Sequence, residues 1–218
     1  MAGQIFAYIA HKTGKADDSA LELATAAGKI YPDAPTTAIV TGAGADLDAV
    51  CSEVAQSYKD VWKFDHDALA YPNAEAIRKL LIGILPQDAI LLAPHDTFGM
   101  DLCPGLSIKL DTVFVPDVVD FEGLEGNTLK VVRQEYSGQV STHLTGDIAN
   151  GAVITVRPGV FQPDESGSAG GQVIDKSSEV ADLTTGRRFL EIVAAEVGDV
   201  DITKEDVLVS VGRGIEDQ

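Results

Sequence analysis

Short apolar runs alternate with helix-like repeats through the first half of the chain, and this alternation limits the fold more than any other feature. Residues 88–93 form a run without polar alternation, which is typical of a strand covered on both faces. After that run, Leu102, Leu106 and Leu110 recur at helical spacing. The pattern predicts an α/β fold in which helices wrap a parallel sheet. Strands are expected at 5–10, 37–41, 61–64, 88–93 and 113–115, and further helices at Ser19, Asp46 and Asn73.

The spacing of Ser19 and Glu22 is that of a capping box, in which each side chain binds a backbone N–H at the start of the helix. Asp46 is the expected cap of the second helix, and Asn73 is expected to open the third.

From about Leu129 the pattern changes to strand-like runs separated by turn residues, with no helix between them. The runs cover residues 129–133, 140–144 and 152–157, and they predict an antiparallel extension of the parallel sheet. Residues 163–171 are rich in Gly and Ser and are expected to form a loop. One more strand is expected at residues 188–194.

The last apolar run, at residues 206–211, predicts a buried strand, and the turn Gly212-Arg213-Gly214 follows it. An α/β fold calls for a covering helix next, yet the sequence ends at Gln218. We therefore expect residues 1–204 to form one domain. Residues 205–218 are expected to begin a second domain, most of which lies outside this chain.

The chain is strongly acidic, with 16 Lys and Arg against 34 Asp and Glu and a formal net charge of −18. Such a field repels phosphate backbones, so nucleic acid is excluded as a partner. No run approaches the roughly 18 apolar residues of a membrane helix, and the N-terminus has no signal-peptide pattern. We expect no membrane insertion and a cytoplasmic location.

Cysteine and histidine placement argues against a metal site or a catalytic triad. Cys51 and Cys103 are expected to be buried free thiols. His11, His66, His95 and His143 have no suitable mutual spacing and are expected to be surface or capping residues. His95 and Asp96 follow a predicted strand at its carboxyl end, where α/β proteins bind ligands, so this pair is a candidate site. No Ser or Thr lies in a nucleophile-elbow context, so a hydrolase is unsupported.

Gly42-Ala43-Gly44 follows the second predicted strand and has two interpretations. It is either a phosphate cradle or an ordinary tight turn. The third glycine of a dinucleotide fingerprint is missing and the motif follows the wrong strand, so the turn is favoured.

Three stretches, taken together and in order, resemble the electron-transfer flavoprotein α subunit. The first runs from Ala93 to Asp111, with Met100 in place of the family's usual Arg. The second joins Arg133-x-x-Tyr136-x-Gly138 to the segment Thr155-Val156-Arg157-Pro158-Gly159. The third runs from Asp201 to Ile215 and resembles the junction between the two α-subunit domains. The resemblance covers essentially the whole chain.

The resemblance implies an adenine-nucleotide-α-hydrolase-like, Rossmann-like domain within a heterodimer of α and β subunits. It implies an electron carrier rather than an enzyme, with FAD passing electrons from an acyl-CoA or other dehydrogenase to a quinone reductase, ferredoxin or similar acceptor. The FAD would be bound mainly by the missing C-terminal domain. The cofactor-binding residues carried over are Gly212, Arg213 and Gly214, since a guanidinium beside flavin neutralises phosphate or stabilises the reduced ring.

Several alternatives stay open at this point. Gly212-Arg213-Gly214 would be a plain turn if the resemblance did not hold. Arg133 and Tyr136 suit either a β-turn scaffold or a subunit interface, where Tyr and Arg are enriched. The alternative function is a stand-alone Rossmann-like nucleotide-binding or interaction module without flavin. Whether the flavoprotein is a bifurcating one is not decided by the sequence, because a second FAD would lie in the β subunit.

Overall fold

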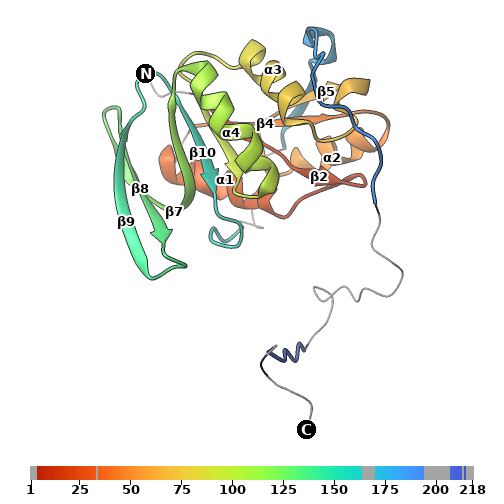
Figure 1. The fold of residues 1–218 in the computed structure, drawn as a ribbon. Helices are drawn as coiled ribbons and strands as arrows, with labels where there is room; N and C mark the ends of the chain where they lie inside the picture. Colours follow the sequence, from red (N-terminus) through yellow and green to blue (C-terminus); the bar gives the residue numbers. More distant parts are fainter. Residues whose placement is uncertain (1–3, 33, 164–169, 194–206, 213, 215–218) are drawn as a thin grey trace. The chain divides into compact units, whose positions relative to one another are not determined.

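The computed structural model describes residues 4–32, 34–163, 170–193, 207–212 and 214. The chain divides into two units, residues 1–188 and residues 189–218, and each is described by itself. Unit 1 carries every helix and strand that the structure assigns in those ranges (Figure 1).

A nine-stranded sheet forms the centre of unit 1 among the described residues, in the order β11-β5-β4-β1-β6-β10-β7-β8-β9. Strands β11 to β7 are parallel neighbours, while β7, β8 and β9 pair antiparallel. A separate hairpin joins β2 and β3. The predicted α/β, Rossmann-like sheet with an antiparallel extension is confirmed. The strands are β1 (Ile5–Tyr8), β2 (His11–Lys12), β3 (Lys15–Ala16), β4 (Thr36–Gly42), β5 (Asp60–Asp65), β6 (Ile90–Pro94), β7 (Val113–Glu125), β8 (Thr128–Glu135), β9 (Val140–Asp147), β10 (Ala152–Val156) and β11 (Gln172–Asp175).

Helices cover both faces of the parallel part of the sheet. Successive side chains of a strand point to opposite faces, so alternate residues of one strand pack against different helices. Helices α1 (Ser19–Ile30) and α2 (Asp46–Val54) pack in one apolar cluster with Ile5 and Ala7 of β1. Helices α3 (Ala74–Ile84) and α4 (Thr97–Leu110) pack in another with Phe6 and Tyr8. Two short 3₁₀ turns, η1 (Asp67–Leu69) and η2 (Ser177–Glu179), complete the set. Within the described residues, none of the helices has the length and apolar character needed to cross a bilayer.

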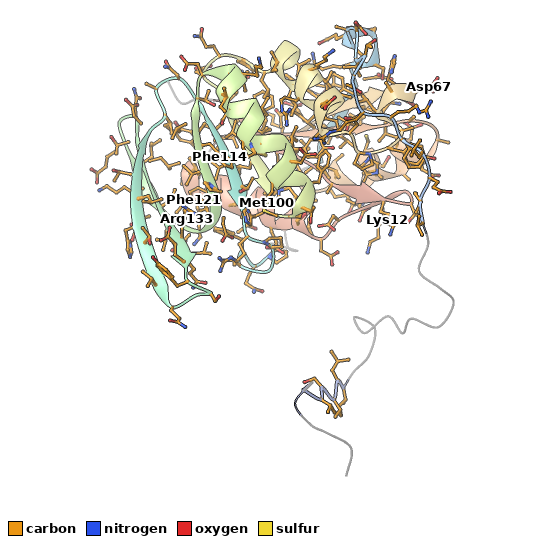
Figure 2. All side chains as sticks on the ribbon, in the orientation of Figure 1. Lys12, Asp67, Met100, Phe114, Phe121 and Arg133 are labelled. Carbon is orange, nitrogen blue, oxygen red and sulfur yellow. The ribbon has the colours of Figure 1, made fainter. Side chains whose placement is uncertain are left out.

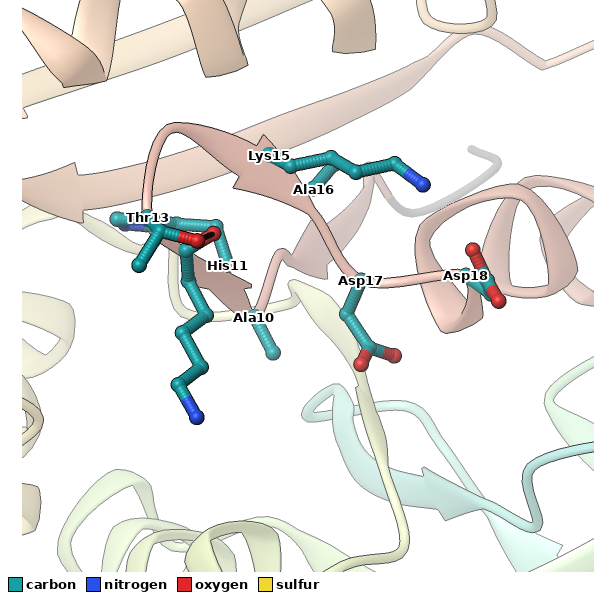
Figure 3. Close-up of a pocket in the computed structure, with 8 residues that line it drawn as sticks. Ala10, His11, Thr13, Lys15, Ala16, Asp17 and Asp18 are labelled. Carbon is teal, nitrogen blue, oxygen red and sulfur yellow. Dashed lines mark hydrogen bonds between the residues drawn. The ribbon is translucent and has the colours of Figure 1, made fainter. Parts of the chain in front are cut away.

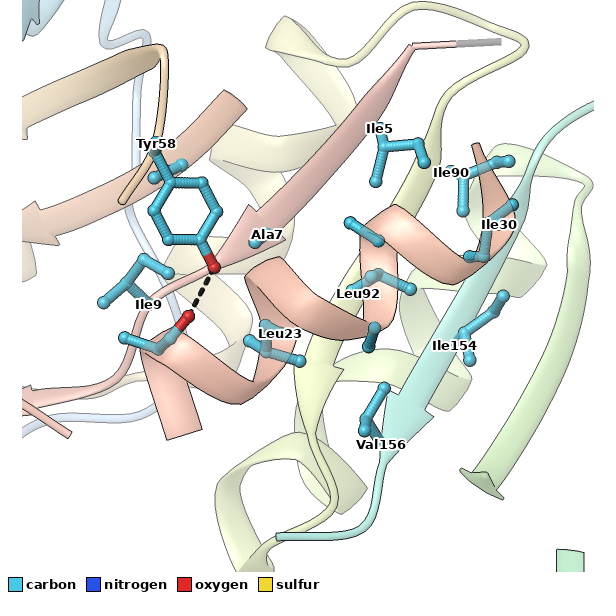
Figure 4. Close-up of a cluster of buried hydrophobic side chains, with 14 of the residues drawn as sticks. Ile5, Ala7, Ile9, Leu23, Ile30, Tyr58, Ile90, Leu92, Ile154 and Val156 are labelled. Atoms are coloured by element: carbon cyan, nitrogen blue, oxygen red, sulfur yellow. Dashed lines mark hydrogen bonds between the residues drawn. The ribbon is translucent and has the colours of Figure 1, made fainter. Parts of the chain in front are cut away.

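Figure 4 shows the first cluster, in which Leu23 and Ile30 of α1 lie against alternate residues of β1, β6 and β10. Tyr58 is fully buried at its edge and donates its hydroxyl to the carbonyl of Ala20 at 2.6 Å. That hydrogen bond satisfies the one polar atom of a large apolar side chain, which makes its burial favourable.

One predicted strand has a different place from the one expected. The run at 152–157 was expected in the antiparallel extension, but β10 lies inside the parallel sheet, between β6 and β7. All five of its residues are buried, as a two-sided parallel strand requires. The extension therefore consists of the outer part of β7 with β8 and β9.

Two predicted helix caps were also wrong. Helix α1 begins at Ser19 after Asp18, whose side chain makes no capping hydrogen bond. The carboxylate of Glu22 instead accepts the N–H of Gly159, at 2.9 and 2.8 Å to its two oxygens. Helix α2 begins at Asp46 itself, after Ala45. The third helix starts as predicted, since Asn73 accepts the N–H groups of Glu75 and Ala76.

The two predicted C-terminal strands are not formed in the described residues. Residues 188–193 and 207–211 have no strand assignment, and their side chains are exposed. A strand needs a neighbouring strand for its backbone N–H and C=O groups, and the structure assigns no strand pairing to these described residues. Residues 194 and 206 lie outside the described ranges, as do residues 164–169 of the predicted loop. The domain boundary at 204/205 stays a prediction.

Both cysteines are buried free thiols, as predicted. Burial raises the pKa of Cys51 to about 11 and that of Cys103 to about 12, because the apolar surroundings disfavour the thiolate. We expect neither thiol to react with an aromatic disulfide reagent at pH 8 in the folded chain, and both to react fully in concentrated guanidinium. Rapid labelling of the native chain would contradict this burial.

Candidate functional site

The strand order of the sheet has a topological switch point beside β1. From β1 the chain passes through α1 to β4 on one side, and from β5 it passes through α3 to β6 on the other side. In open α/β sheets, ligands bind in the crevice at the carboxyl ends of the two strands that flank such a switch. The segments that follow β1 and β6 are therefore the first place to look for a site.

After β1, the β2–β3 hairpin frames a hollow of about 280 Å³ lined by residues 10–13 and 15–18. Figure 3 shows Lys15 and Asp17 among the side chains that line the hollow. Asp17 accepts the backbone N–H of Ser19 at 2.9 Å, and His11 Nε2 donates to the carbonyl of Thr41 at 2.8 Å. Two lysines and two aspartates line the hollow, so their charges cancel and favour neither an anion nor a cation.

After β6, the predicted pair His95 and Asp96 has structural partners. Asp96 caps α4 by accepting the N–H of Gly99 at 2.6 Å. His95 Nδ1 lies 2.9 Å from Thr155 Oγ1, and its Nε2 lies 3.9 Å from Asp117 Oδ1. The pair thus joins α4 and β6 to the end of β10.

A hydrogen-bonded network surrounds Asp117, which lies in β7 with a positive φ of 60°. Arg157 holds its carboxylate with two hydrogen bonds, at 2.8 Å from Nε and 2.5 Å from Nη2. The guanidinium of Arg157 holds the pKa of the Asp117 carboxyl below its usual range. The N–H of Asp117 donates to Thr155 Oγ1 at 3.1 Å, and Gln134 Oε1 accepts from Arg157 at 2.6 Å. Thr155 is fully buried, so the network fixes the junction of β10, β7 and β8 and exposes no nucleophile.

The motif Gly42-Ala43-Gly44 is an ordinary turn, as the sequence favoured. The N–H of Gly44 already donates to Asp65 Oδ1 at 3.1 Å. Asp46 and Asp48 follow in the first turn of α2. Carboxylates thus occupy the place that a phosphate would need, and their charge repels one.

The remaining histidines have ordinary roles. His66 Nδ1 accepts the N–H of Ala68 and caps η1, while the exposed His143 pairs with Glu122 at 2.9 Å. Across the described ranges, no group of three or more His, Cys, Asp or Glu side chains is placed to hold a metal ion.

Arg133 and Tyr136 both lie in the antiparallel extension. Arg133 is in β8 and lines a mainly apolar hollow of about 200 Å³ together with Val131 and Leu144. Figure 2 labels it near Phe121 of the neighbouring strand β7. Tyr136 lies in the β8–β9 turn with a positive φ of 51° and is 76% exposed. The turn conformation and this exposure suit both interpretations, the turn scaffold and the interface.

The cofactor motif predicted from the resemblance lies after unit 1, at residues 212–214, and stays a prediction. Arg213 lies outside the described residues, while Gly212 and Gly214 are exposed with open space around them. The hollows of about 280 and 200 Å³ in unit 1 fall below the usual range for a drug-sized ligand, and FAD is larger still. They do not fit FAD.

Comparison with known proteins decides the family. A model of the electron transfer flavoprotein domain matches residues 5–181. The chain belongs to the electron transfer flavoprotein family. The match takes in all of the parallel sheet, the switch point and the antiparallel extension, and the sequence resemblance is confirmed.

Several relatives carry the α-subunit name, and another is named a subunit beta. The electron transfer flavoprotein subunit alpha of Megasphaera elsdenii is 26% identical over 178 residues, covering 79% of this chain and 52% of that protein. The subunit alpha of Methylophilus methylotrophus is 29% identical over 129 residues, covering 58% of this chain and 39% of that protein. The acryloyl-CoA reductase electron transfer subunit beta of Anaerotignum propionicum is 22% identical over 240 residues, covering 97% and 65%. This flavoprotein-family chain thus spans 52% and 39% of the lengths of the first two relatives.

The sequence pointed to His95 and Asp96. It did not show that Asp117 and Thr155 would join the hydrogen-bonded network around Arg157, or that Glu22 would bind Gly159. Arg157 was noticed only as part of a motif. Asp117 lies 40 positions before Arg157, and no local pattern connects them.

Proposed function

We propose that this chain is the N-terminal part of an electron-transfer flavoprotein α subunit. In a heterodimer with a β subunit, it would carry electrons by FAD from an acyl-CoA or other dehydrogenase to a quinone reductase, ferredoxin or similar acceptor. The observation that carries the proposal is the family match over residues 5–181. The proposal includes the cytoplasmic location expected from the sequence.

FAD is proposed to bind mainly to residues that follow this chain in longer relatives. Two facts support this: the two hollows described above do not fit FAD, and the chain spans 52% and 39% of the lengths of the first two relatives. Bound FAD supplies the redox chemistry, and Arg213 is the residue proposed to hold its phosphate or to balance charge on the reduced ring.

The antiparallel extension is proposed as the surface that meets the β subunit. Strand β9 is an edge strand of the sheet, with its backbone groups open to pairing. The exposed Tyr136 and the apolar hollow beside Arg133 add the residue types that dominate protein interfaces.

The test is co-expression with the β subunit encoded by the same organism, followed by size-exclusion chromatography. We expect a one-to-one complex at micromolar concentration and a colourless 218-residue chain when it is purified alone. Tyr136→Ala should weaken the complex about tenfold, since interface tyrosines are frequent hot spots. The control Lys29→Ala, at an exposed ion pair with Asp120, should leave it unchanged. No association would contradict the proposal, and a yellow chain with stoichiometric flavin would contradict the placement of FAD.

Arg213 is tested in a longer α polypeptide that contains the whole FAD-binding part. Arg213→Ala is expected to shift the flavin potential or loosen FAD, and Arg213→Lys to keep most of the charge effect. An unchanged potential with full FAD retention would reduce Arg213 to a turn residue.

A further inference from the structure

The last stretch of unit 1, residues 176–188, has almost no secondary structure yet makes many specific contacts. It follows β11, contains η2, and is the blue segment that runs beside α3 in Figure 1. Leu183 is only 6% exposed and packs in the apolar cluster of α3 and α4. Residue 188 is also where unit 1 ends. We call residues 176–188 the strap.

The start of helix α3 binds the strap. Asn73 caps α3 with its side-chain oxygen, and its Nδ2 donates to Thr185 Oγ1 at 3.1 Å and to the carbonyl of Arg187 at 3.4 Å. Glu75 accepts the N–H of Gly186 at 3.1 Å. Lys79, one turn further on, donates to the carbonyl of Thr184. Four consecutive strap residues, 184–187, are thus hydrogen-bonded to one helix and its cap.

Arg187 joins this helix to its neighbour. Its Nε lies 3.2 Å from Glu75 Oε1 in α3. Its two terminal nitrogens bind the carboxylate of Asp101 in α4, one of them at 3.2 Å. The planar guanidinium suits such paired contacts, which a lysine cannot reproduce. The next residue, Arg188, is exposed.

We propose that Arg187, bound between Glu75 and Asp101, is a latch that fixes the point at which the chain leaves the sheet domain. Without the latch, only the hydrogen bonds from Asn73 and Lys79 would hold the last residues of the strap to α3, and these residues would separate from it more often. With it, the strap stays bound to α3 and α4 as far as residue 187. Arg187 is thus a positioning residue for the part of the chain that carries Arg213, and in this respect the inference rests on the proposed function.

An isolated exposed ion pair contributes little, and the side chains of Arg187, Asp101 and Glu75 are 53%, 41% and 35% exposed. The latch differs from such a pair because one guanidinium bridges two helices while the three residues before it are held by hydrogen bonds. A strap that is already ordered by Leu183 and Asn73 needs little further side-chain ordering at Arg187. Its effect should therefore be local, and salt should weaken it.

The test uses the 218-residue chain and needs neither flavin nor a β subunit, so its failure is distinct from failure of the proposed function. The latch is opened by Glu75→Gln with Asp101→Asn, which keeps Arg187 as a trypsin site. We expect amide hydrogen exchange of residues 184–188 to accelerate about fivefold or more, with exchange in β1, β4 and β6 unchanged. Trypsin cleavage after Arg187 should rise to the same degree.

Two further variants make the result decisive. Arg187→Lys should give an intermediate acceleration, because one charge remains and the paired contact is lost. Asp120→Asn, which breaks the exposed pair with Lys29, should leave the strap unchanged. Unchanged exchange at 184–188 in the double variant would overturn the latch. Equal acceleration throughout the sheet would also overturn it, since the two carboxylates would then act on overall stability.

Discussion

Gly151→Ala is expected to lower the free energy of unfolding by about 3 kcal/mol or more. Gly151 has a φ of +88°, which L-residues rarely adopt, and it lies where the chain turns into β10. A Cβ there would lie 2.4 Å from the carbonyl oxygen of Ala89. That oxygen accepts the N–H of Ala152 at 3.0 Å, so relief of the clash would break the pairing of β10 with β6. Urea unfolding followed by circular dichroism gives the measurement.

The matched control is Gly83→Ala, the same chemical change in a different setting. Gly83 is exposed in α3, and a Cβ added to it would have no neighbouring atom within 4 Å. Alanine there should stabilise the chain by up to about 1 kcal/mol, because glycine is a poor helix former. Similar midpoints for the two variants would show that the start of β10 tolerates a side chain.

Arg157→Ala is expected to cost about 2 kcal/mol at pH 7. The change leaves the Asp117 carboxylate, whose side chain is 18% exposed, without its paired partner, and it leaves the positive φ of that residue without support. Arg157→Lys should recover only part of the loss, because one ammonium cannot make both contacts. Asp117→Gly should partly rescue Arg157→Ala, because glycine removes the charge and accepts the positive φ. A double-mutant cycle measures this coupling.

The stability difference between wild type and Arg157→Ala should depend on pH. The pKa of Asp117 is lowered in the folded chain, mainly by Arg157. The carboxylate therefore contributes stability above the ordinary Asp pKa of about 4 and loses it as pH falls through the lower folded value. The difference should be full at about pH 6 and shrink below about pH 4. A constant difference down to about pH 2 would show that Arg157 acts by packing alone.

Local pattern was enough to predict the elements of the parallel sheet. The apolar runs of β1, β4 and β6 are buried on both faces. Short runs of this kind, without polar alternation, are typical of strands in a parallel sheet. Asn73 predicted the start of α3 because a cap acts within three residues of itself.

Partners distant in sequence were beyond the reach of such patterns. A buried run such as β10 carries no sign of which strands will flank it, so its place between β6 and β7 was missed. Glu22 has the spacing of half a capping box, yet its carboxylate binds Gly159, 137 positions later. The apolar run 207–211 has the composition of a strand but lacks a paired neighbour among the described residues.

The insertion of β10 also constrains the order in which the sheet is completed. Strands β6 and β7 follow one another along the chain, with α4 between them, but they do not pair, because β10 lies between them in the sheet. During synthesis, β7, β8 and β9 emerge first and can form a local antiparallel meander. The gap beside β6 then stays open until residues 152–156 leave the ribosome. Insertion of a parallel strand between two others is a non-local step of high contact order, so it is slow. Until it is complete, the edges of β6 and β7 stay unpaired and are exposed to aggregation. The strand that joins the extension to the sheet is therefore made only after the whole extension has been made.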